Sequence, residues 1–340
     1  MAKILVTGAN GYIGAQTCKQ LTKENHHVVA VDRNPIRHEY YNDFFEGSYT
    51  DPAILAFLKG VDCVVHIGAT SLVGPSVLDP STYYFNNVTG TLVLLDACKT
   101  VGINRFVFAS SAAVYGEPEE EYCTETSEVK PVNPYGWSKR MTEIMLKDFA
   151  RAYSLASVSL RFFNVAGADS EGELGQEKDG THIIAKLMEM TMDGKDFTLN
   201  GDDFKTPDGT CIRDYVHVED VAGGIVKAVE FTKSNIGAHI FNLGDGKGYS
   251  NKEIVKAVED NTPLKPNVKF GPARAGDPAK LVANDFITSG VLGWKPKYDL
   301  NHIVKTAYEW YTRKEVKHSA DILVFNSEKN KNGKKWRNKK

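Results

Sequence analysis

The sequence predicts an α/β fold built on a doubly wound, parallel sheet. Short apolar runs without charge alternate with amphipathic stretches of helical length along the first half of the chain. This alternation is the pattern of parallel strands joined by crossover helices. The first apolar run, residues 4–6, leads directly into the spacing Gly8-x-x-Gly11-x-x-Gly14. Such a turn between a strand and a helix is typical of the Rossmann-type dinucleotide-binding fold.

The glycine turn and the second strand predict a site for NAD. Gly8 allows a tight turn, Gly11 lets a pyrophosphate approach the backbone, and Gly14 lets the helix pack close to the strand. The N-terminus of that helix offers free amide groups and a partial positive charge to phosphates. The second apolar run, residues 28–31, ends in Asp32, eighteen residues beyond Gly14. A carboxylate at this position can bind the ribose hydroxyls of NAD, and it would repel the 2′-phosphate of NADP.

Three further elements complete the expected first half of the sheet. A short helix at 52–59 precedes a strand at 62–67, and Gly68 directly after it lets the backbone approach a cofactor. A long helix from 86 to 100 and a strand at 105–109 follow. The apolar residues of that helix that we expect to face the sheet are Leu92, Leu95, Ala97 and Val101.

The segment Asn133-Pro-Tyr-Gly-Trp-Ser-Lys139 predicts a catalytic pair. Pro134 is typical of a helix start, which places Tyr135 and Lys139 one turn apart on the same face. An unperturbed tyrosine has a pKa of about 10, and a nearby ammonium group together with a positive nicotinamide ring should lower it. Ser111, at a strand end, can hydrogen-bond the same substrate hydroxyl. These groups predict hydride chemistry at a carbon that bears a hydroxyl, with Tyr135 as the base.

The second half of the chain contains candidates for binding a second diphosphate, on the substrate. Arg213 lies beside the polar, glycine-containing stretch 201–210, and a guanidinium group binds phosphate oxygens bidentately. A structural pair between Arg213 and Asp214 is an equally good interpretation. A second arginine, Arg274, lies in the segment 272–278. Two arginines in a dinucleotide-binding protein indicate a substrate that carries a diphosphate.

Composition excludes several other classes of protein. The 340 residues, 42% hydrophobic and 25% charged, suit a globular protein of one large or two moderate domains. No apolar stretch reaches the length of a membrane span and the N-terminus has no signal-peptide pattern, so we expect a cytoplasmic protein without membrane association. The five cysteines are scattered without a Cys-x-x-Cys pair, which predicts reduced thiols and no metal site.

The end of the chain is strongly basic. Residues 326–340 contain seven Lys or Arg and one acidic residue, and they show no periodic apolar pattern. We therefore expect residues 321–340 to form a disordered tail. A solvated extension explains this tail more simply than a nucleic-acid or membrane-surface contact.

Taken in order, the motifs resemble those of the UDP-glucose 4-epimerases (also called UDP-galactose 4-epimerases), in the extended short-chain dehydrogenase/reductase family. They span about residues 1–315, and the most specific is Asp208-Gly-Thr-Cys-Ile-Arg-Asp-Tyr-Val-His-Val218. The other matching motifs are Thr7-Gly-Ala-Asn-Gly-Tyr-Ile-Gly14, Asn86-Asn-Val-Thr-Gly-Thr91, Ser110-Ser-Ala-Ala-Val-Tyr-Gly116, Asn133-Pro-Tyr-Gly-Trp-Ser-Lys139, Leu160-Arg-Phe-Phe-Asn164 and Arg274-Ala-Gly-Asp277.

The resemblance implies interconversion of UDP-galactose and UDP-glucose, by transient oxidation at C4 and hydride return to the opposite face. Tyr135 would remove the 4-OH proton, Ser111 would assist at O4, and Lys139 would hold the nicotinamide ribose. The residues implied to contact NAD are Gly8, Gly11, Tyr12, Ile13, Gly14, Asp32, Ser48, Tyr49, Gly68, Asn87, Ser110, Tyr135, Lys139 and Phe163. Those implied to contact the UDP-sugar are Ser111, Tyr135, Asn164, His182, Arg213, Arg274 and Asp277.

The family's organisation implies two domains and a homodimer. Residues 1–163, with 211–243 returning to them, would form the NAD-binding domain. Residues 164–320 would form a smaller, discontinuous α/β domain for the UDP-sugar. The helices near 86–100 and 135–153 would form the contact between two copies.

Three alternatives are weighed against this interpretation. A sugar-nucleotide 4,6-dehydratase needs an acid and a base directly after the strand-end serine, but Ala112 and Ala113 can transfer no proton. A 4-epimerase of UDP-N-acetylhexosamines or UDP-uronic acids would have the same catalytic residues, so it stays open. A non-catalytic NAD-binding regulator would not need Ser111, Tyr135 and Lys139.

The sequence departs from the family pattern at Ser48, Tyr49 and Ser71. These residues replace residues that often contact NAD in the family, and the replacements bear on the affinity for NAD.

Overall fold

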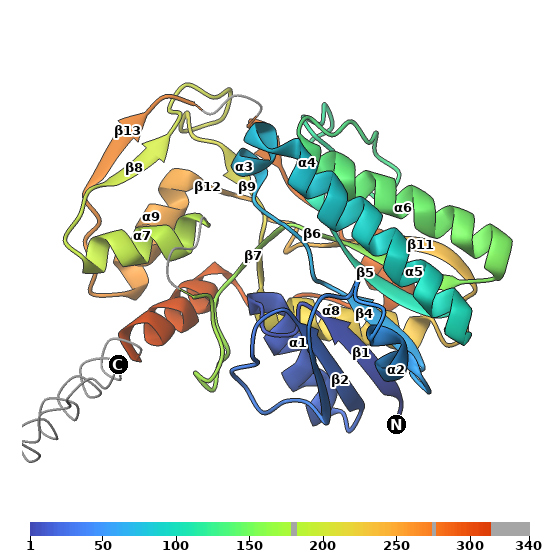
Figure 1. Ribbon diagram of the computed structural model, residues 1–340. Helices are drawn as coiled ribbons and strands as arrows, with labels where there is room; N and C mark the ends of the chain where they lie inside the picture. The colour runs from blue at the N-terminus through green and yellow to red at the C-terminus, as the bar shows by residue number, and fades with distance from the viewer. Residues whose placement is uncertain (178–181, 274–276, 314–340) are drawn as a thin grey trace, which may run out of the picture.

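The computed structural model describes residues 1–177, 182–273 and 277–313. The predicted tail at 321–340 and the predicted substrate residue Arg274 lie outside the described residues. A larger lobe is built on one central sheet, and a smaller lobe lies beside it at the end where the described chain finishes (Figure 1).

The central sheet has seven strands in the order β11-β6-β5-β4-β1-β2-β3, and every neighbouring pair is parallel. The prediction of a doubly wound parallel sheet is therefore confirmed. The strand order reverses between β1 and β4, and ligands bind beyond the carboxyl ends of the strands at such a reversal. The strands are β1 Lys3–Thr7, β2 His27–Asp32, β3 Asp43–Glu46, β4 Cys63–His66, β5 Arg105–Ser111, β6 Ala156–Phe162 and β11 Gly237–Leu243.

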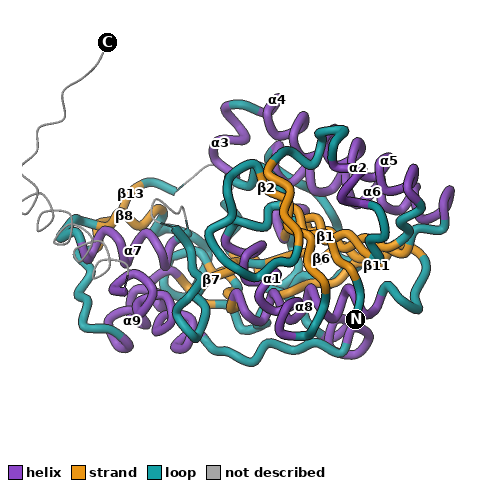
Figure 2. The backbone as a smooth tube through the Cα atoms, turned by 60° about the horizontal axis from the view of Figure 1, so that its bottom comes forward, coloured by secondary structure: helices purple, strands orange, loops and turns teal. Residues whose placement is uncertain are grey.

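Helices cover both faces of this sheet, which is why its strands are apolar on both sides. Figure 2 shows α1 (Tyr12–Lys23) and α8 (Val218–Phe231) on one side of the strands, with α2 (Ile54–Leu58), α5 (Gly90–Val101) and α6 (Pro134–Tyr153) on the other. Alternate residues of β1 serve the two cores. Ile4 and Val6 pack with α1 and α8, whereas Leu5 packs with α2, α5 and α6.

The predicted helix at 86–100 differs from the structure in its register. Its first part is a π-helix, Tyr84–Thr89, and α5 begins only at Gly90. Each π turn adds a residue, so the face toward the sheet shifts. Leu95 is buried as expected, but Leu92 is 44% exposed, which makes its predicted packing wrong, and Leu94 is fully buried instead.

The smaller lobe has its own core between α7 (Ile183–Met192), α9 (Asn251–Asn261) and a helix over residues 300–313. Three small sheets lie outside the central sheet: β7 Asn164–Ala166 with β10 Tyr215–His217, β8 Phe197–Asn200 with β13 Val268–Gly271, and β9 Ile212–Arg213 between β12 Tyr249–Ser250 and β14 Lys280–Leu281. Two short helices of the larger lobe, α3 Val73–Leu78 and α4 Pro80–Tyr83, precede the π-helix.

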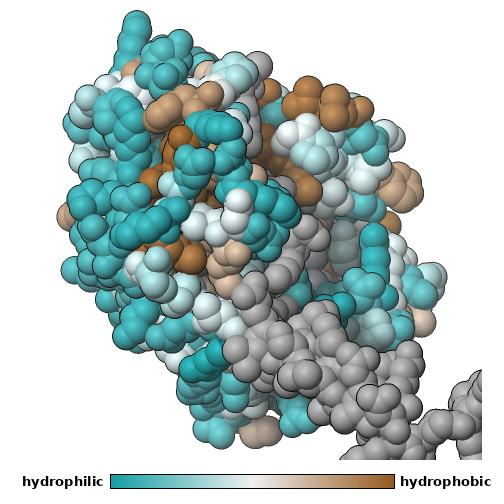
Figure 3. Space-filling model, turned by 90° about the vertical axis from the view of Figure 1, so that its left-hand side faces the viewer, coloured by the Kyte–Doolittle hydropathy of each residue, from teal (hydrophilic) through white to brown (hydrophobic). Residues whose placement is uncertain are grey.

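The small-lobe end of the molecule is mainly hydrophilic at its surface (Figure 3). Within the described part of the chain, every helix is too short or too polar to cross a membrane.

Candidate functional site

The glycine turn brings β1, α1 and β4 into direct backbone contact. Gly8 has a φ of +69°, and a Cβ there would lie 2.8 Å from the Cα of Gly68. A Cβ on Gly14 would lie 1.9 Å from the carbonyl oxygen of Gly8. Both positions therefore require glycine. Without side chains at these positions, a pyrophosphate could approach the backbone of the turn.

The start of α1 leaves its first amide groups available. Gly11 is the N-cap residue, and no side chain of the described residues caps the helix. The N–H groups of Tyr12 and Ile13 therefore remain donors for a phosphate. The Tyr12 side chain is directed elsewhere, because its hydroxyl donates to the carbonyl oxygen of Gly167 at 2.7 Å.

Asp32 ends β2 beside this turn. Its two carboxylate oxygens accept hydrogen bonds from the backbone N–H groups of Asn10 and Asn34, each at 3.0 Å. These contacts fix the carboxylate at the carboxyl end of β2, the position expected of a ribose-binding acid.

Ser48 and Tyr49, two positions expected to contact NAD, differ in their environments. Ser48 is half-buried, and its hydroxyl shares a hydrogen bond with the Thr50 hydroxyl at 2.7 Å. Tyr49 points into the core, where its hydroxyl donates to the carbonyl oxygen of Asn86 at 2.9 Å and its ring packs edge-on against His66. A contact between NAD and Tyr49 would therefore involve its backbone or its ring edge, not its hydroxyl.

Asn87 and Ser110 also use their side chains within the protein. The amide of Asn87 accepts from the N–H of Thr70 at 2.8 Å and donates to the Ser138 hydroxyl at 3.0 Å. Asn87 thus ties the loop after β4 to α6. The Ser110 hydroxyl donates to Glu143 at 2.7 Å and is buried, so a contact of Ser110 with NAD would have to come from its backbone.

The start of α6 places the predicted base beside the end of β5. Asn133 caps the helix by accepting from the N–H of Gly136 at 2.8 Å, and Pro134 occupies its first turn. A Cβ on Gly136 would lie 2.5 Å from the carbonyl oxygen of Ala113. This close approach brings the Tyr135 phenol within hydrogen-bonding reach of Ser111.

Lys139 lies one turn further along, almost fully buried. Its Nζ donates to the carbonyl oxygen of Ala109 at 2.7 Å and lies 5.8 Å from the centre of the Tyr135 ring. The structure therefore brings Ser111, Tyr135 and Lys139 together. The Tyr83 ring, 6.5 Å from that of Tyr135, completes the surroundings of the phenol. No local sequence pattern points to Tyr83, because only the tertiary fold brings its short helix to α6.

The electrostatics differ from the expectation. Burial raises the pKa of Tyr135, as does the nearby Tyr83, while the hydrogen bond from Ser111 opposes them. Burial also lowers the pKa of Lys139 to about 7, and the Glu143 carboxylate works in the opposite direction. In this structure burial therefore outweighs the groups that would lower the pKa of the phenol.

The substrate candidates lie where the small sheets meet the large one. Asn164 begins β7, and its N–H donates to the carbonyl oxygen of Asp214 at 2.9 Å. Nη2 of Arg213 lies 3.7 Å from Oδ1 of Asp277. Phe163 is buried, with its ring 6.4 Å from that of Tyr115.

Asp214 is not the partner of Arg213, the alternative left open by the sequence. Its buried carboxylate accepts from the backbone N–H groups of Asp245, Gly246 and Ala283 at 2.6, 2.9 and 3.0 Å. Burial raises its pKa to about 6, against the effect of these hydrogen bonds. Asp214 therefore anchors two loops, and Arg213 pairs with Asp277 instead.

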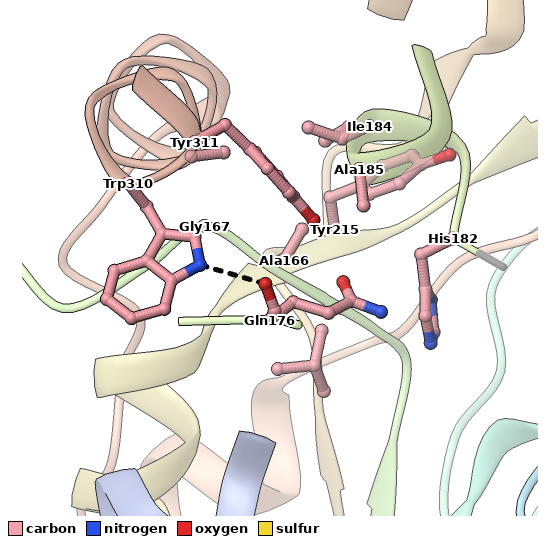
Figure 4. Close-up of a pocket in the computed structure, with 11 residues that line it drawn as sticks. Ala166, Gly167, Gln176, His182, Ile184, Ala185, Tyr215, Trp310 and Tyr311 are labelled. Carbon is pink, nitrogen blue, oxygen red and sulfur yellow. Dashed lines mark hydrogen bonds between the residues drawn. The ribbon is translucent and has the colours of Figure 1, made fainter. Parts of the chain in front are cut away.

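A small pocket lies beside these residues, between β7, the start of α7 and the helix over 300–313 (Figure 4). The Trp310 indole closes one side by donating to the carbonyl oxygen of Gln176 at 2.8 Å. The Gln176 amide points toward His182 across the pocket. The structure thus places His182 on a wall next to β7, the strand that begins with Asn164.

Comparisons with known proteins agree with this site. A sequence profile described as the NAD dependent epimerase/dehydratase family matches residues 4–244. A curated UDP-glucose 4-epimerase of Lactobacillus helveticus is 38% identical over 320 residues, covering 91% of this chain and 97% of that protein. Among solved structures, the UDP-glucose 4-epimerase of Brucella ovis in complex with NAD has a TM-score of 0.86 and 40% identity, covering 91% of this chain and 98% of that one.

A second solved structure is the UDP-glucose-4-epimerase of Stenotrophomonas maltophila with bound NAD and formylated UDP-arabinopyranose. It has a TM-score of 0.89 and 30% identity, and the match covers 93% of this chain and 99% of that one. The resemblance found in the motifs is confirmed. The chain therefore belongs to the NAD-dependent epimerase/dehydratase family, in which its relatives over almost the whole length are UDP-glucose 4-epimerases.

Proposed function

We propose that this protein interconverts UDP-galactose and UDP-glucose by inverting C4 of the sugar with a bound NAD. The observation that carries the proposal is the meeting of Ser111, Tyr135 and Lys139 at the carboxyl end of β5, in the same sheet as the glycine turn after β1. A base, a hydroxyl donor and an ammonium group at that place suit oxidation of a secondary alcohol. The relatives that match 91% of the chain support the same reaction.

The residues present fit an NAD cofactor. The glycine backbone and the free amides of Tyr12 and Ile13 would hold the pyrophosphate, and Asp32 would hold the adenosine ribose. A bound NAD⁺ supplies the acceptor and later the donor of the C4 hydride. Gly68 would add a close backbone contact, since a Cβ there would meet the ring of Tyr49 at 3.1 Å.

The chain's own residues would handle the proton and orient the sugar. Tyr135 takes the proton of the 4-hydroxyl and returns it after the sugar has presented its other face. Ser111 hydrogen-bonds O4 in both orientations, and the Lys139 ammonium stabilises the phenolate. Ala112 and Ala113 follow Ser111 directly and can transfer no proton, which argues against a 4,6-dehydratase.

The UDP-sugar is proposed to lie between the two lobes. Arg213 and Arg274 would bind its diphosphate, with Asp277, Asn164 and His182 around the nucleotide and the sugar. In this arrangement, residues 1–163 with 211–243 form the NAD-binding domain and residues 164–320 form the smaller domain. The pairing of β11 with β6 supports the return of the chain to the larger sheet.

We also propose a homodimer formed through α5 and α6. These helices and the π-helix before them carry large exposed apolar side chains, as a buried interface requires. The six most relevant are Phe85, Leu92, Val93, Trp137, Met141 and Ile144, which are 37–70% exposed. Sedimentation should show a dimer, and a Trp137→Glu variant should be monomeric.

The five cysteines are all buried free thiols. Reduced thiols support a cytoplasmic location, which cell fractionation would test.

The test uses purified protein with no NAD added. UDP-galactose is supplied, and UDP-glucose is quantified together with the NAD that the denatured protein releases. We expect turnover and released NAD from the wild type, and released NAD without turnover from Tyr135→Phe. A parallel reaction with UDP-N-acetylgalactosamine tests the second candidate, a 4-epimerase of N-acetylated UDP-sugars. A protein that releases NAD but converts neither sugar would contradict the proposal and favour a regulatory role.

A further inference from the structure

Beneath the catalytic part of α6 lies a buried carboxylate that the proposed chemistry does not use. Glu143 is 4% exposed, one turn beyond Lys139 and two turns beyond Tyr135. The three side chains therefore share one face of the helix. A buried carboxylate is costly unless it is fully hydrogen-bonded, so its partners indicate what it does.

Four donors surround the Glu143 carboxylate. Arg161 of β6 binds both oxygens, Nε at 2.9 Å and Nη2 at 2.8 Å. The Ser110 hydroxyl of β5 donates at 2.7 Å, and Nη1 of Arg140 on α6 itself donates at 3.2 Å. Both side chains of the Glu143–Arg161 pair are only 1% exposed. The carboxylate thus joins the catalytic helix to the two strands whose carboxyl ends border the site.

Arg161 is in turn fixed from its other side. Its Nη1 donates to the Tyr115 hydroxyl at 3.0 Å, and that hydroxyl contacts the amide oxygen of Asn242 on β11 at 2.6 Å. The network therefore extends from α6 across β5 and β6 to β11. Burial raises the pKa of Tyr115, so its hydroxyl stays protonated.

Lys139 needs a counter-charge, and Glu143 lies one turn along the same buried face of α6, where its carboxylate favours the charged ammonium. The Lys139 ammonium is packed over the ring of Phe108 and donates to a carbonyl oxygen, in surroundings that favour its neutral form. The other titratable groups that face Lys139 do not supply a negative charge. Tyr135 on the same helix is a phenol, and His66 on β4 is neutral because burial and Lys139 lower its pKa to about 3. The remaining nearby charges, Arg161 on β6 and Arg140 on α6, are positive.

We propose that Glu143 is a positioning residue of the active site: held by Arg161 and Ser110, its carboxylate keeps Lys139 in the charged form and fixes α6 against β5 and β6. The role rests on the proposed function, because a charged Lys139 matters when Tyr135 must become a phenolate. Activity then falls at alkaline pH as Lys139 loses its proton. The charge of Glu143 sets the pH at which this fall occurs.

The decisive variant is Glu143→Gln, which keeps the shape and removes the charge. It takes away the attraction on the ammonium and leaves Arg161 unpaired, and both changes favour neutral Lys139. We expect the fall of kcat at alkaline pH to occur about one to two pH units lower than in the wild type. The same shift should appear in the titration of Lys139 itself, followed by the ¹³Cε signal in lysine-labelled protein and assigned with Lys139→Arg.

Three further variants separate charge from structure. Glu143→Asp keeps the charge on a shorter side chain. The pH midpoint of the Lys139 titration should therefore stay near the wild-type value in this variant, while kcat falls. The double variant Glu143→Gln/Arg161→Gln should have a midpoint between those of Glu143→Gln and the wild type. It also keeps the test available if the single variant does not fold. Asp220→Asn, which alters an equally buried carboxyl on the opposite face of the sheet, should shift neither profile.

The outcomes for the proposed function and for this inference are distinct. Folded Glu143→Gln with an unchanged Lys139 midpoint would overturn the positioning role, whatever the enzyme does. A wild type without epimerase activity would contradict the proposed function, while the Lys139 titration would still decide the role of Glu143.

Discussion

Lys19 is a buried ammonium group on α1 that binds three carboxylates of the loop after β7, and its removal tests how that loop is attached. Its Nζ lies 2.8 Å from Asp169, 2.7 Å from Glu171 and 2.6 Å from Glu173. Burial works to lower the pKa of Lys19, but the hydrogen bonds that its ammonium donates to these carboxylates outweigh this effect and raise the pKa. The ammonium is therefore charged at neutral pH.

The perturbation is Lys19→Met, which keeps the apolar stem and removes the charge. Glu171 and Glu173 are about half exposed and can turn to water, but the Asp169 side chain is fully buried. Among the described residues, the Asp169 carboxylate would keep only the N–H of Glu173 at 3.0 Å and a long contact with Gln16. Breaking a buried ion pair in this way costs about 3–5 kcal/mol. For a chain of this size, with an unfolding entropy of roughly 0.7 kcal/mol/K, such a loss lowers Tm by roughly 4–7 °C.

The assay is thermal unfolding followed by circular dichroism, with Lys23→Met as the matched control. Lys23 lies one turn further along α1 and pairs with Glu171, but both side chains are about half exposed. An exposed pair contributes about 1 kcal/mol or less. In a double variant, Asp169→Leu should restore much of the stability lost in Lys19→Met. Equal losses in Lys19→Met and Lys23→Met would refute the reasoning.

The remaining predictions concern acid stability, the cofactor and turnover. The hydrogen bonds from Lys19 and Lys23 lower the pKa of Glu171 from 4.5 to about 2. The stabilisation that the ionised Glu171 contributes is therefore present above pH 4.5 and is lost as the pH falls toward 2. Between these pH values the free energy of unfolding should fall less in Lys19→Met than in the wild type. Gly14→Ala should yield protein without NAD, measured after denaturation, whereas Gly223→Ala, whose Cβ meets no described atom within 4 Å, should retain it. Ser111→Ala should lower kcat by about 10²-fold, with NAD content unchanged.

The parts of the fold that could be predicted are those decided by local pattern. β1, β2, β4, β5 and β6 are largely buried on both faces, so they appear in the sequence as mainly apolar runs. The edge strand β3, Asp43–Glu46, was missed because it is only half buried and its sequence does not alternate. The face of α5 was misjudged because a π-helix before it changes the register, and no propensity signals that insertion.

The site follows the same division. Tyr135 and Lys139 are one turn apart on one helix and Ser111 ends a strand, so spacing alone brings them to one place. Tyr49, turned into the core, could not have been foreseen, because its environment comes from segments distant in sequence. Glu143 could have been found, since it continues the face of Tyr135 and Lys139 by one more turn. Arg161 is a charged residue in an otherwise uncharged strand. The sequence shows this exception, but only the structure explains it through the pairing of Arg161 with Glu143.

The electrostatics of the site argue that base and cofactor must act together. Among the protein's own groups, burial raises the pKa of Tyr135, and Ser111 offsets only part of this. Burial also lowers the pKa of Lys139 to about 7, so its charge is easily lost. The protein therefore does not supply a ready phenolate. A cationic ligand beside the phenol would favour the phenolate, and the positive charge of an oxidised nicotinamide meets that requirement. Proton removal would then be coupled to the oxidised cofactor, which suits a reaction whose first step is oxidation.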